Sequence, residues 1–308
     1  MRKNFLTLIA AASLLMGCGS SSDPTIVSVE GGKVQGVETE IPGVYVYKGI
    51  PYAAAPVGDL RWKAPQPVTP WKGVKVADSY GPGAYQAPHT SENPWTSEFY
   101  MNDPQFSEDC LYLNVFTKAP GQTDRKLPVA MWIHGGAYTG GWGYEIEFDG
   151  KRWADKDVVL VTINYRLGIF GFMVHPLLSA ENPEGMSGNY GILDQIAALK
   201  WVYNNIEQFG GDPENITIFG QSAGAGSVKN LVSSPMTGTM IKKAIIQSGG
   251  GVSDRPGRPA DLDMIGSNSK KILDWAGFDT LEKMRAASTE EVFGAAAAYA
   301  AATGDRAT

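Results

Sequence analysis

The chain has 308 residues, of which 43% are hydrophobic and 19% are charged, and its formal net charge is −6. These values are typical of a globular protein with a sizeable core, and the negative charge gives no indication of a nucleic-acid-binding protein. The length suits one large domain or two ordinary ones. No internal repeat with a period of roughly 20 to 50 residues is present, which argues against solenoid and propeller architectures.

The first 17 residues are predicted to be a targeting segment. Arg2 and Lys3 precede an apolar stretch, Phe5–Met16, that is too short to span a bilayer. The letters "LMGC" at 15–18 resemble a bacterial lipoprotein signal, which predicts cleavage before Cys18 and acylation of that cysteine. An ordinary secretory signal with an incidental cysteine is the alternative. The prediction is an exported protein of the bacterial cell envelope, lipid-anchored at the outer membrane or the periplasmic face.

Residues 18–25 are rich in Gly and Ser and are predicted to be a flexible tether. Short β patterns follow at 25–29, 33–37 and 44–48, with a hairpin turn at Gly31-Gly32. A proline-rich irregular stretch comes next, and residues 79–109 are predicted to be a long loop.

From residue 111 the pattern changes to apolar strands that alternate with helices. This alternation predicts an α/β fold with a mostly parallel central sheet flanked by helices. The expected strands are 111–117, 129–134, 158–164, 216–219 and 244–247. The expected helices are about 191–209, one that begins at 222, 261–276, and one that is opened by a capping box at Ser288 and ends near Gly304. No strand is predicted after 247.

Ser222 stands at the junction between a predicted strand and a predicted helix. The pentapeptide Gly220-Gln221-Ser222-Ala223-Gly224 fits the G-x-S-x-G nucleophile elbow. Flanking glycines remove Cβ atoms that would collide with neighbouring backbone in such a sharp turn. A helix N-terminus beside the serine favours a developing oxyanion.

A second motif, "WIHGGAY" at 132–138, follows another predicted strand and fits an HGGG-type oxyanion loop. The backbone N–H groups of Gly136, Ala137 and Ala223 are the expected oxyanion donors. A plain turn between a strand and a helix is the alternative. His134 is expected to orient this loop rather than to act as a base.

Longer stretches resemble the type-B carboxylesterases, the α/β-hydrolase family that includes carboxylesterases and cholinesterases. The matching segments are "YKGIPYAAAPVGDLRWKAPQP" (47–67), "SEDCLYLNVFTKAP" (107–120), "WIHGGAYTGG" (132–141), "VTINYRLGIFGF" (161–172), "GNYGILDQIAALKWVYNNIEQFGGDPENITIFGQSAGAGSV" (188–228) and "KKAIIQSGG" (242–250).

The resemblance implies an α/β-hydrolase domain over 26–308 that is incomplete at its C-terminal end. It implies hydrolysis of a small-molecule ester through an acyl-enzyme on Ser222, with Gly136, Ala137 and Ala223 as oxyanion donors. It implies neither a metal nor an organic cofactor.

The chain departs from the family pattern in the loop before Cys110. The family's cysteine in "EDC" usually pairs with one at the start of that loop, about where Tyr85 stands here. The loop 86–109 is therefore expected to lack a disulfide and is a candidate lid, and Tyr100 in it is a candidate substrate contact. Cys110 is expected to be a buried free thiol.

The larger departure concerns the catalytic base. The three histidines, His89, His134 and His175, all precede Ser222, whereas α/β-hydrolases place the acid and then the histidine after the serine. Three explanations stay open. The chain is the N-terminal fragment of a longer esterase, or it is a catalytically silent binding or adhesion domain, or His175 substitutes as base. The last requires His175 within about 3.2 Å of the Ser222 hydroxyl.

Overall fold

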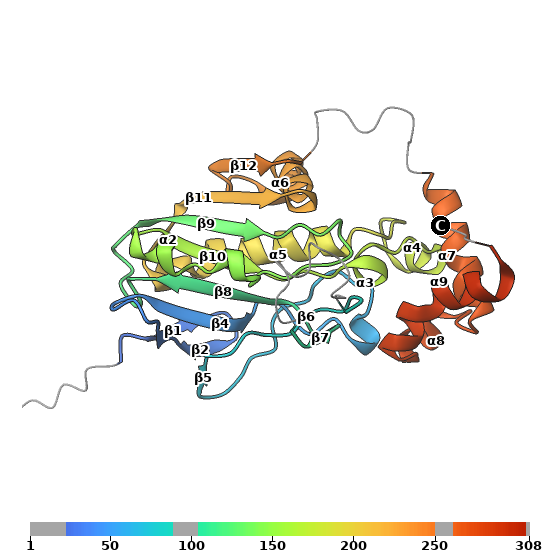
Figure 1. Ribbon diagram of the computed structural model, residues 1–308, viewed down its shortest axis with the longest axis horizontal. Helices are drawn as coiled ribbons and strands as arrows, with labels where there is room; N and C mark the ends of the chain where they lie inside the picture. The colour runs from blue at the N-terminus through green and yellow to red at the C-terminus, as the bar shows by residue number, and fades with distance from the viewer. Residues whose placement is uncertain (1–22, 89–103, 250–260, 306–308) are drawn as a thin grey trace, which may run out of the picture.

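A computed structural model of the chain describes residues 23–88, 104–249 and 261–305. Its largest sheet has seven strands, in the order β12-β11-β9-β10-β8-β4-β3 (Figure 1). These strands are β3 (Val37–Glu38), β4 (Tyr45–Pro51), β8 (Tyr112–Thr117), β9 (Leu127–Ile133), β10 (Val159–Ile163), β11 (Gly211–Gln221) and β12 (Lys243–Gln247).

The four strands β9 to β12 form the parallel part of this sheet. β9 pairs in parallel with β10 and β11, and β11 pairs in parallel with β12. β10 pairs with β8, β8 with β4, and β4 with β3 in antiparallel fashion. The predicted α/β fold is confirmed, and the described sheet is mixed because its early strands are antiparallel. A short connection between β3 and β4 permits only that direction.

Two small sheets are formed by strands outside the main sheet. β1 (Ile26–Val29) and β2 (Gly32–Gln35) form the predicted antiparallel hairpin, which turns at Gly31 with a φ of +92°. β2 also pairs in parallel with β5 (Val74–Val76). The other small sheet joins β6 (Gly83–Ala84) to β7 (Phe106–Ser107) across the segment predicted to be a loop.

The longest helix, α5 (Tyr190–Asn205), matches the predicted amphipathic segment and continues into the 3-10 turn η3 (Ile206–Phe209). Gly210 ends it in a left-handed conformation with a φ of 76°. The other elements before residue 250 are α2 (Lys151–Asp155), α3 (Gly168–Phe172), α4 (Pro176–Glu181), α6 (Ala223–Ser233), η1 (Gly58–Leu60), η2 (Ile146–Phe148) and η4 (Pro235–Thr237). Within the described segments, no helix is long and apolar enough to cross a membrane.

The C-terminal helices form a group at one end of the sheet, drawn orange to red in Figure 1. They are α7 (Leu262–Trp275), α8 (Leu281–Ala286) and α9 (Thr289–Thr303). The predicted capping box at Ser288 and Glu291 is present, and Gly304 ends α9. These helices share a buried apolar cluster with α3, which includes Phe170, Leu273 and Met284.

A buried ion pair holds the C-terminal helices to the early part of the chain. The Arg61 guanidinium donates to both carboxylate oxygens of Glu108, at 2.8 and 2.6 Å. It also donates to the backbone oxygens of Met284 and Ala287, each at 2.8 Å, and the Thr289 hydroxyl donates to Glu108 at 2.6 Å. The carbonyls at the end of α8 are therefore satisfied by a cation from outside the helix.

Cys110 is fully buried with a free thiol, as predicted, and burial raises its pKa well above the usual range. Tyr85 packs edge-on against Phe170 and Phe293. Tyr100 and most of the candidate lid lie outside the described residues, as do Cys18 and the predicted targeting segment.

Candidate active site

Ser222 lies at a sharp turn between β11 and α6. Its backbone has φ 55° and ψ −121°, and its side chain is exposed. Its N–H donates to the Gln247 oxygen at 2.9 Å, and its own oxygen accepts from the Gly226 N–H at 3.0 Å. A non-glycine residue with such a positive φ costs on the order of 1–3 kcal/mol and persists only where its surroundings over-determine it.

The two glycines of the pentapeptide are required by close backbone approach. A Cβ on Gly220 would lie 2.6 Å from the backbone of Gly224, and a Cβ on Gly224 would lie 2.1 Å from the Ile133 oxygen. Any larger residue at either position would force the strand and the helix apart. The predicted strand-turn-helix geometry around Ser222 is therefore what the structure has.

The loop after β9 lies directly beside Ser222. A Cβ on Gly135 would be 3.4 Å from the Ser222 Cβ. The next three residues, Gly136, Ala137 and Tyr138, have φ values of 97°, 55° and 62°. The Gly136 oxygen accepts from the N–H groups of Thr139 and Gly140, at 2.9 and 3.0 Å, so the loop closes as a tight turn.

The three predicted oxyanion donors are free to bind a ligand. Within residues 23–88, 104–249 and 261–305, the N–H groups of Gly136, Ala137 and Ala223 donate no hydrogen bond. Ala223 is the first residue of α6, where the helix N-terminus adds partial positive charge. An anionic oxygen on a carbon atom that is bonded to the Ser222 oxygen would meet unpaired donors from both segments.

His134 is part of the scaffold behind this loop. Its Nδ1 lies 2.9 Å from the Gly135 oxygen, and its ring stacks on Tyr165 with centroids 4.4 Å apart. The Tyr165 hydroxyl donates to the His134 oxygen at 2.9 Å. The side chain is fully buried, and desolvation lowers its pKa to about 4. A neutral imidazole that holds the Gly135 carbonyl suits the predicted role of orienting the loop.

His175 makes no hydrogen bond to the serine in the described parts of the chain. Its Nδ1 accepts from the Leu177 N–H at 3.2 Å and caps α4. Its buried Nε2 finds no hydrogen-bond partner in the described parts of the chain, and the same holds for the Nε2 of His134. Neither ring is therefore hydrogen-bonded to Ser222, and the geometry required for His175 as base is absent. His89 lies outside the described residues.

Sequence reasoning missed the side chains that fix the far end of the loop. Gln86 contacts both backbone polar groups of Gly141, and Glu145 accepts the Trp142 N–H at 2.9 Å. Burial raises the pKa of Glu145 to about 8. Gln86 lies far from the loop in sequence and belongs to a segment without regular periodicity, so no local pattern indicates its contact.

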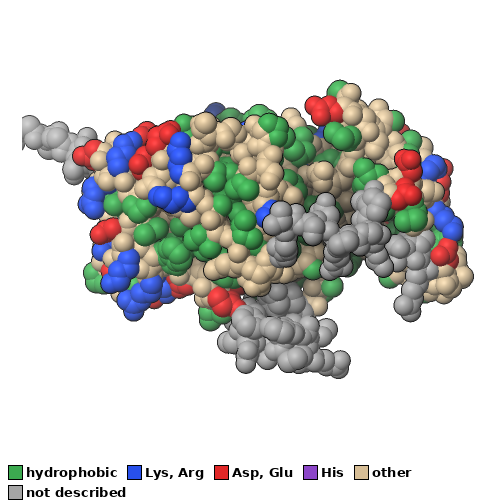
Figure 2. All heavy atoms as spheres, turned by 90° about the horizontal axis from the view of Figure 1, so that it is seen from above, with side chains coloured by type: hydrophobic (Ala, Val, Ile, Leu, Met, Phe, Trp, Pro, Cys, Tyr) green, Lys and Arg blue, Asp and Glu red, His purple; other side chains and the backbone are tan. Residues whose placement is uncertain are grey.

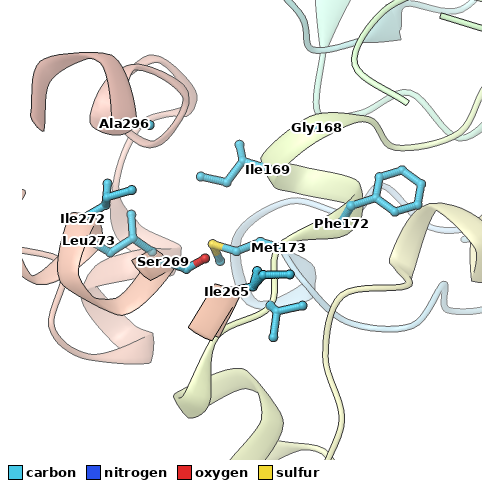
Figure 3. A pocket seen from close by; sticks show the side chains of 10 residues that line it. Gly168, Ile169, Phe172, Met173, Ile265, Ser269, Ile272, Leu273 and Ala296 are labelled. Carbon is cyan, nitrogen blue, oxygen red and sulfur yellow. The ribbon is translucent and has the colours of Figure 1, made fainter. Parts of the chain in front are cut away.

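An apolar cavity of about 260 Å³ lies elsewhere, between α3 and the helices α7 and α9 (Figure 3). Ser269 is the one polar side chain among the residues that line it, and none of them is titratable. This cavity therefore has no chemistry for ester cleavage. Among the residues that the structure describes, no group of three or more His, Cys, Asp or Glu side chains suits a metal ion.

Comparison with known proteins agrees with the geometry. Residues 23–292 match the model of the carboxylesterase family. The para-nitrobenzyl esterase of Bacillus subtilis (strain 168) is 44% identical over 274 residues, which are 88% of this chain and 52% of that protein. The fumonisin B1 esterase of Sphingopyxis macrogoltabida is 42% identical over 246 residues, 79% of this chain and 43% of that protein.

Solved structures show the same relationship. A PNB esterase structure superposes with a TM-score of 0.77 at 40% identity, over 91% of this chain and 54% of that one. A thermophilic PNB esterase gives a TM-score of 0.76 at 39% identity, over 92% and 55%. The chain thus spans about half the length of the relatives that it matches.

Proposed function

Because this chain belongs to the carboxylesterase family, whose solved members share its α/β-hydrolase fold, we propose that it carries the nucleophile and the oxyanion hole of a serine esterase. One observation supports this most directly. The strained Ser222 and the unpaired N–H groups of Gly136, Ala137 and Ala223 lie together at the ends of β9 and β11.

In the proposed reaction the Ser222 oxygen attacks the carbonyl carbon of a carboxylic ester while a base takes the hydroxyl proton. The carbonyl oxygen becomes an oxyanion and accepts hydrogen bonds from the three backbone donors. Removing one such donor typically costs about 10² to 10³ in rate. The alcohol leaves with a proton, and water then cleaves the acyl-enzyme and releases the acid.

The acid and the histidine of the triad are proposed to lie beyond residue 308 of the same gene product. Two observations support this. Neither His134 nor His175 is hydrogen-bonded to Ser222 in the described residues, and the chain spans only about half of its relatives. A serine hydroxyl without a base is a poor nucleophile, so the 308-residue chain alone is expected to be inactive.

The esterase is proposed to be exported and held to the membrane of a bacterial cell envelope by lipid on Cys18. The support is the sequence at 1–18 alone. Metabolic labelling with a radioactive fatty acid tests it. Labelled protein is expected from the natural sequence and none from Cys18→Ser, whereas label on neither would leave an unanchored secreted protein.

The decisive experiment uses everything that the gene encodes, here termed the complete gene product. We expect it to hydrolyse p-nitrophenyl butyrate with an initial burst and to be labelled by a fluorophosphonate on Ser222, and we expect Ser222→Ala to lose both. A complete gene product that neither turns over the ester nor takes the label would instead be the catalytically silent binding domain.

A further inference from the structure

We propose that Gln86 is a positioning residue that holds the oxyanion loop in its donating conformation. The inference rests on the proposed function, since it concerns the loop that carries Gly136 and Ala137. Gln86 belongs to the segment after β6 and reaches the loop from outside.

The Gln86 side-chain amide hydrogen-bonds to both the backbone N–H and the backbone oxygen of Gly141. Its Oε1 accepts the Gly141 N–H at 2.8 Å, and its Nε2 donates to the Gly141 oxygen at 3.0 Å. The same Nε2 donates to the Ala84 oxygen at 3.0 Å, so both amide protons are used. Gln86 is only 3% exposed, which shields these bonds from water. A paired contact of this kind fixes the orientation of Gly141 as well as its position.

The oxyanion loop comprises residues 134–141. Its first residues are fixed by β9 and by the His134 side chain, and Gly141 is its last residue. Between the two ends lie Gly136, Ala137 and Tyr138, all with positive φ. Two of these are not glycine, so the conformation is strained and requires fixed surroundings. Gly141 itself has φ +100°. With Gly141 released, the strain in the loop would be relieved by rotation of the peptide groups that aim the donors.

The space around Gly141 supports the same reading. A Cβ there would lie 2.7 Å from the His134 Nδ1 and 2.9 Å from the Glu145 Oε1. The two side chains that anchor neighbouring backbone, at Gly135 and Trp142, therefore meet at Gly141. Gln86 is the group that holds this junction from a different part of the chain.

A purely structural role for Gln86 makes a different prediction. If the amide only satisfied buried backbone groups, its loss would lower the stability of the whole domain and leave the reactivity of the folded protein unchanged. If it positions the donors, its loss lowers oxyanion stabilisation in protein that is still folded, and substrate affinity in the ground state changes little.

The test compares Gln86→Met, which removes all three bonds at similar volume, with Gln86→Glu, which keeps only an acceptor for the Gly141 N–H. The matched control is Gln66→Met. Gln66 donates to the carbonyl two residues before it, at 2.9 Å, as Gln86 does, but it is exposed and does not contact the loop. All variants are made in the complete gene product.

We expect Gln86→Met to lower kcat for p-nitrophenyl butyrate by about 10- to 100-fold, with KM within about twofold of wild type. A trifluoromethyl ketone binds by addition of the serine oxygen to its carbonyl carbon, which produces an oxyanion. The affinity for this inhibitor should fall by a similar factor. Gln86→Glu should be intermediate, and Gln66→Met should match wild type. Unchanged kcat and ketone affinity in folded Gln86→Met would overturn the proposal.

Hydrogen exchange separates this result from a failure of the proposed function. In Gln86→Met, the amides of residues 139–142, which are hydrogen-bonded in the wild type, should exchange at least tenfold faster, while β9 and β10 keep their protection. Equal acceleration in loop and strands would mean a general structural role and would also overturn the proposal. If the wild-type complete gene product shows no turnover and no label on Ser222, the proposed function fails, and exchange still decides whether Gln86 fixes the loop.

Discussion

At the scale of single residues, Ser222 is exposed and has a positive φ. This strained backbone conformation is held in place by hydrogen bonds on both sides of the turn. The Ser222 N–H is tied to Gln247 on β12 and its oxygen to Gly226 in α6. The G-x-S-x-G spacing predicts this turn from sequence, because each glycine avoids a steric clash. A Cβ on Gly220 would clash with the Gly224 backbone, and a Cβ on Gly224 would clash with the Ile133 oxygen. Strain of this kind at an exposed serine is typical of a functional site.

Ser222→Gly is expected to stabilise the complete gene product by about 1 kcal/mol, because glycine adopts a positive φ without the steric cost of a Cβ. Ser222→Ala keeps the Cβ, so its free energy of unfolding should lie within about 0.5 kcal/mol of the wild-type value. Urea unfolding measures both. Equal stability of the Gly and Ala variants would mean that the turn is not strained.

Glu145 gives the loop scaffold a pH dependence. Its folded pKa, about 8, lies above the ordinary value of 4.5, so the folded state binds more protons than the unfolded state between these values. Stability due to this group is present below about pH 4.5 and is lost as the pH rises towards 8. Glu145→Gln keeps an acceptor for the Trp142 N–H and should remove this slope, which is at most about 1.4 kcal/mol per pH unit.

The measurement is the free energy of unfolding of the complete gene product between pH 5 and pH 9. The Glu145→Gln variant should gain stability over wild type as the pH rises. Glu184→Gln, at an exposed position away from this loop, is the control and should follow the wild-type curve. A difference between Glu145→Gln and wild type that does not vary with pH would contradict the assignment.

At the scale of elements, long periodic segments were predictable and short ones were not. α5 and α9 match their predicted ranges, because an apolar stripe and a capping box are local signals. α2, α3 and α4 were not predicted, since five or six residues do not complete two turns. In the site, the serine and the donor loop follow from local motifs, whereas Gln86 depends on a contact 55 residues away.

The position of the C-terminal helices depends on the Arg61–Glu108 pair, which no sequence pattern indicates. Removing one member of a buried pair leaves an uncompensated charge and typically costs about 3–5 kcal/mol. Arg61→Met should therefore destabilise the complete gene product by this amount and speed hydrogen exchange in α8. The double variant Arg61→Met/Glu108→Leu should recover much of the loss. Full protection of α8 in Arg61→Met would show that apolar packing alone holds these helices.

At the scale of the whole molecule, the β12 edge of the sheet is left uncovered by the described residues. β12 pairs with β11 on one side and has no second neighbour in those parts of the chain. All five of its residues are exposed, including Ile245 at 47% and Ile246 at 44%. Val232 of α6 and Met236 beside it are also exposed, and Figure 2 shows hydrophobic side chains gathered on the face seen from above.

An unpaired parallel strand with apolar side chains offers both hydrogen bonds and an adhesive surface. We therefore expect the 308-residue chain, expressed without further residues of its gene product, to bind ANS and to form concentration-dependent oligomers in sedimentation. Ile245→Lys/Ile246→Lys should reduce both effects, because charge on an edge strand opposes pairing. Val74→Lys/Val76→Lys, on the exposed strand β5, is the matched control and should change neither. A wild-type chain that stays monomeric, binds no ANS and melts cooperatively would show that this edge is already covered.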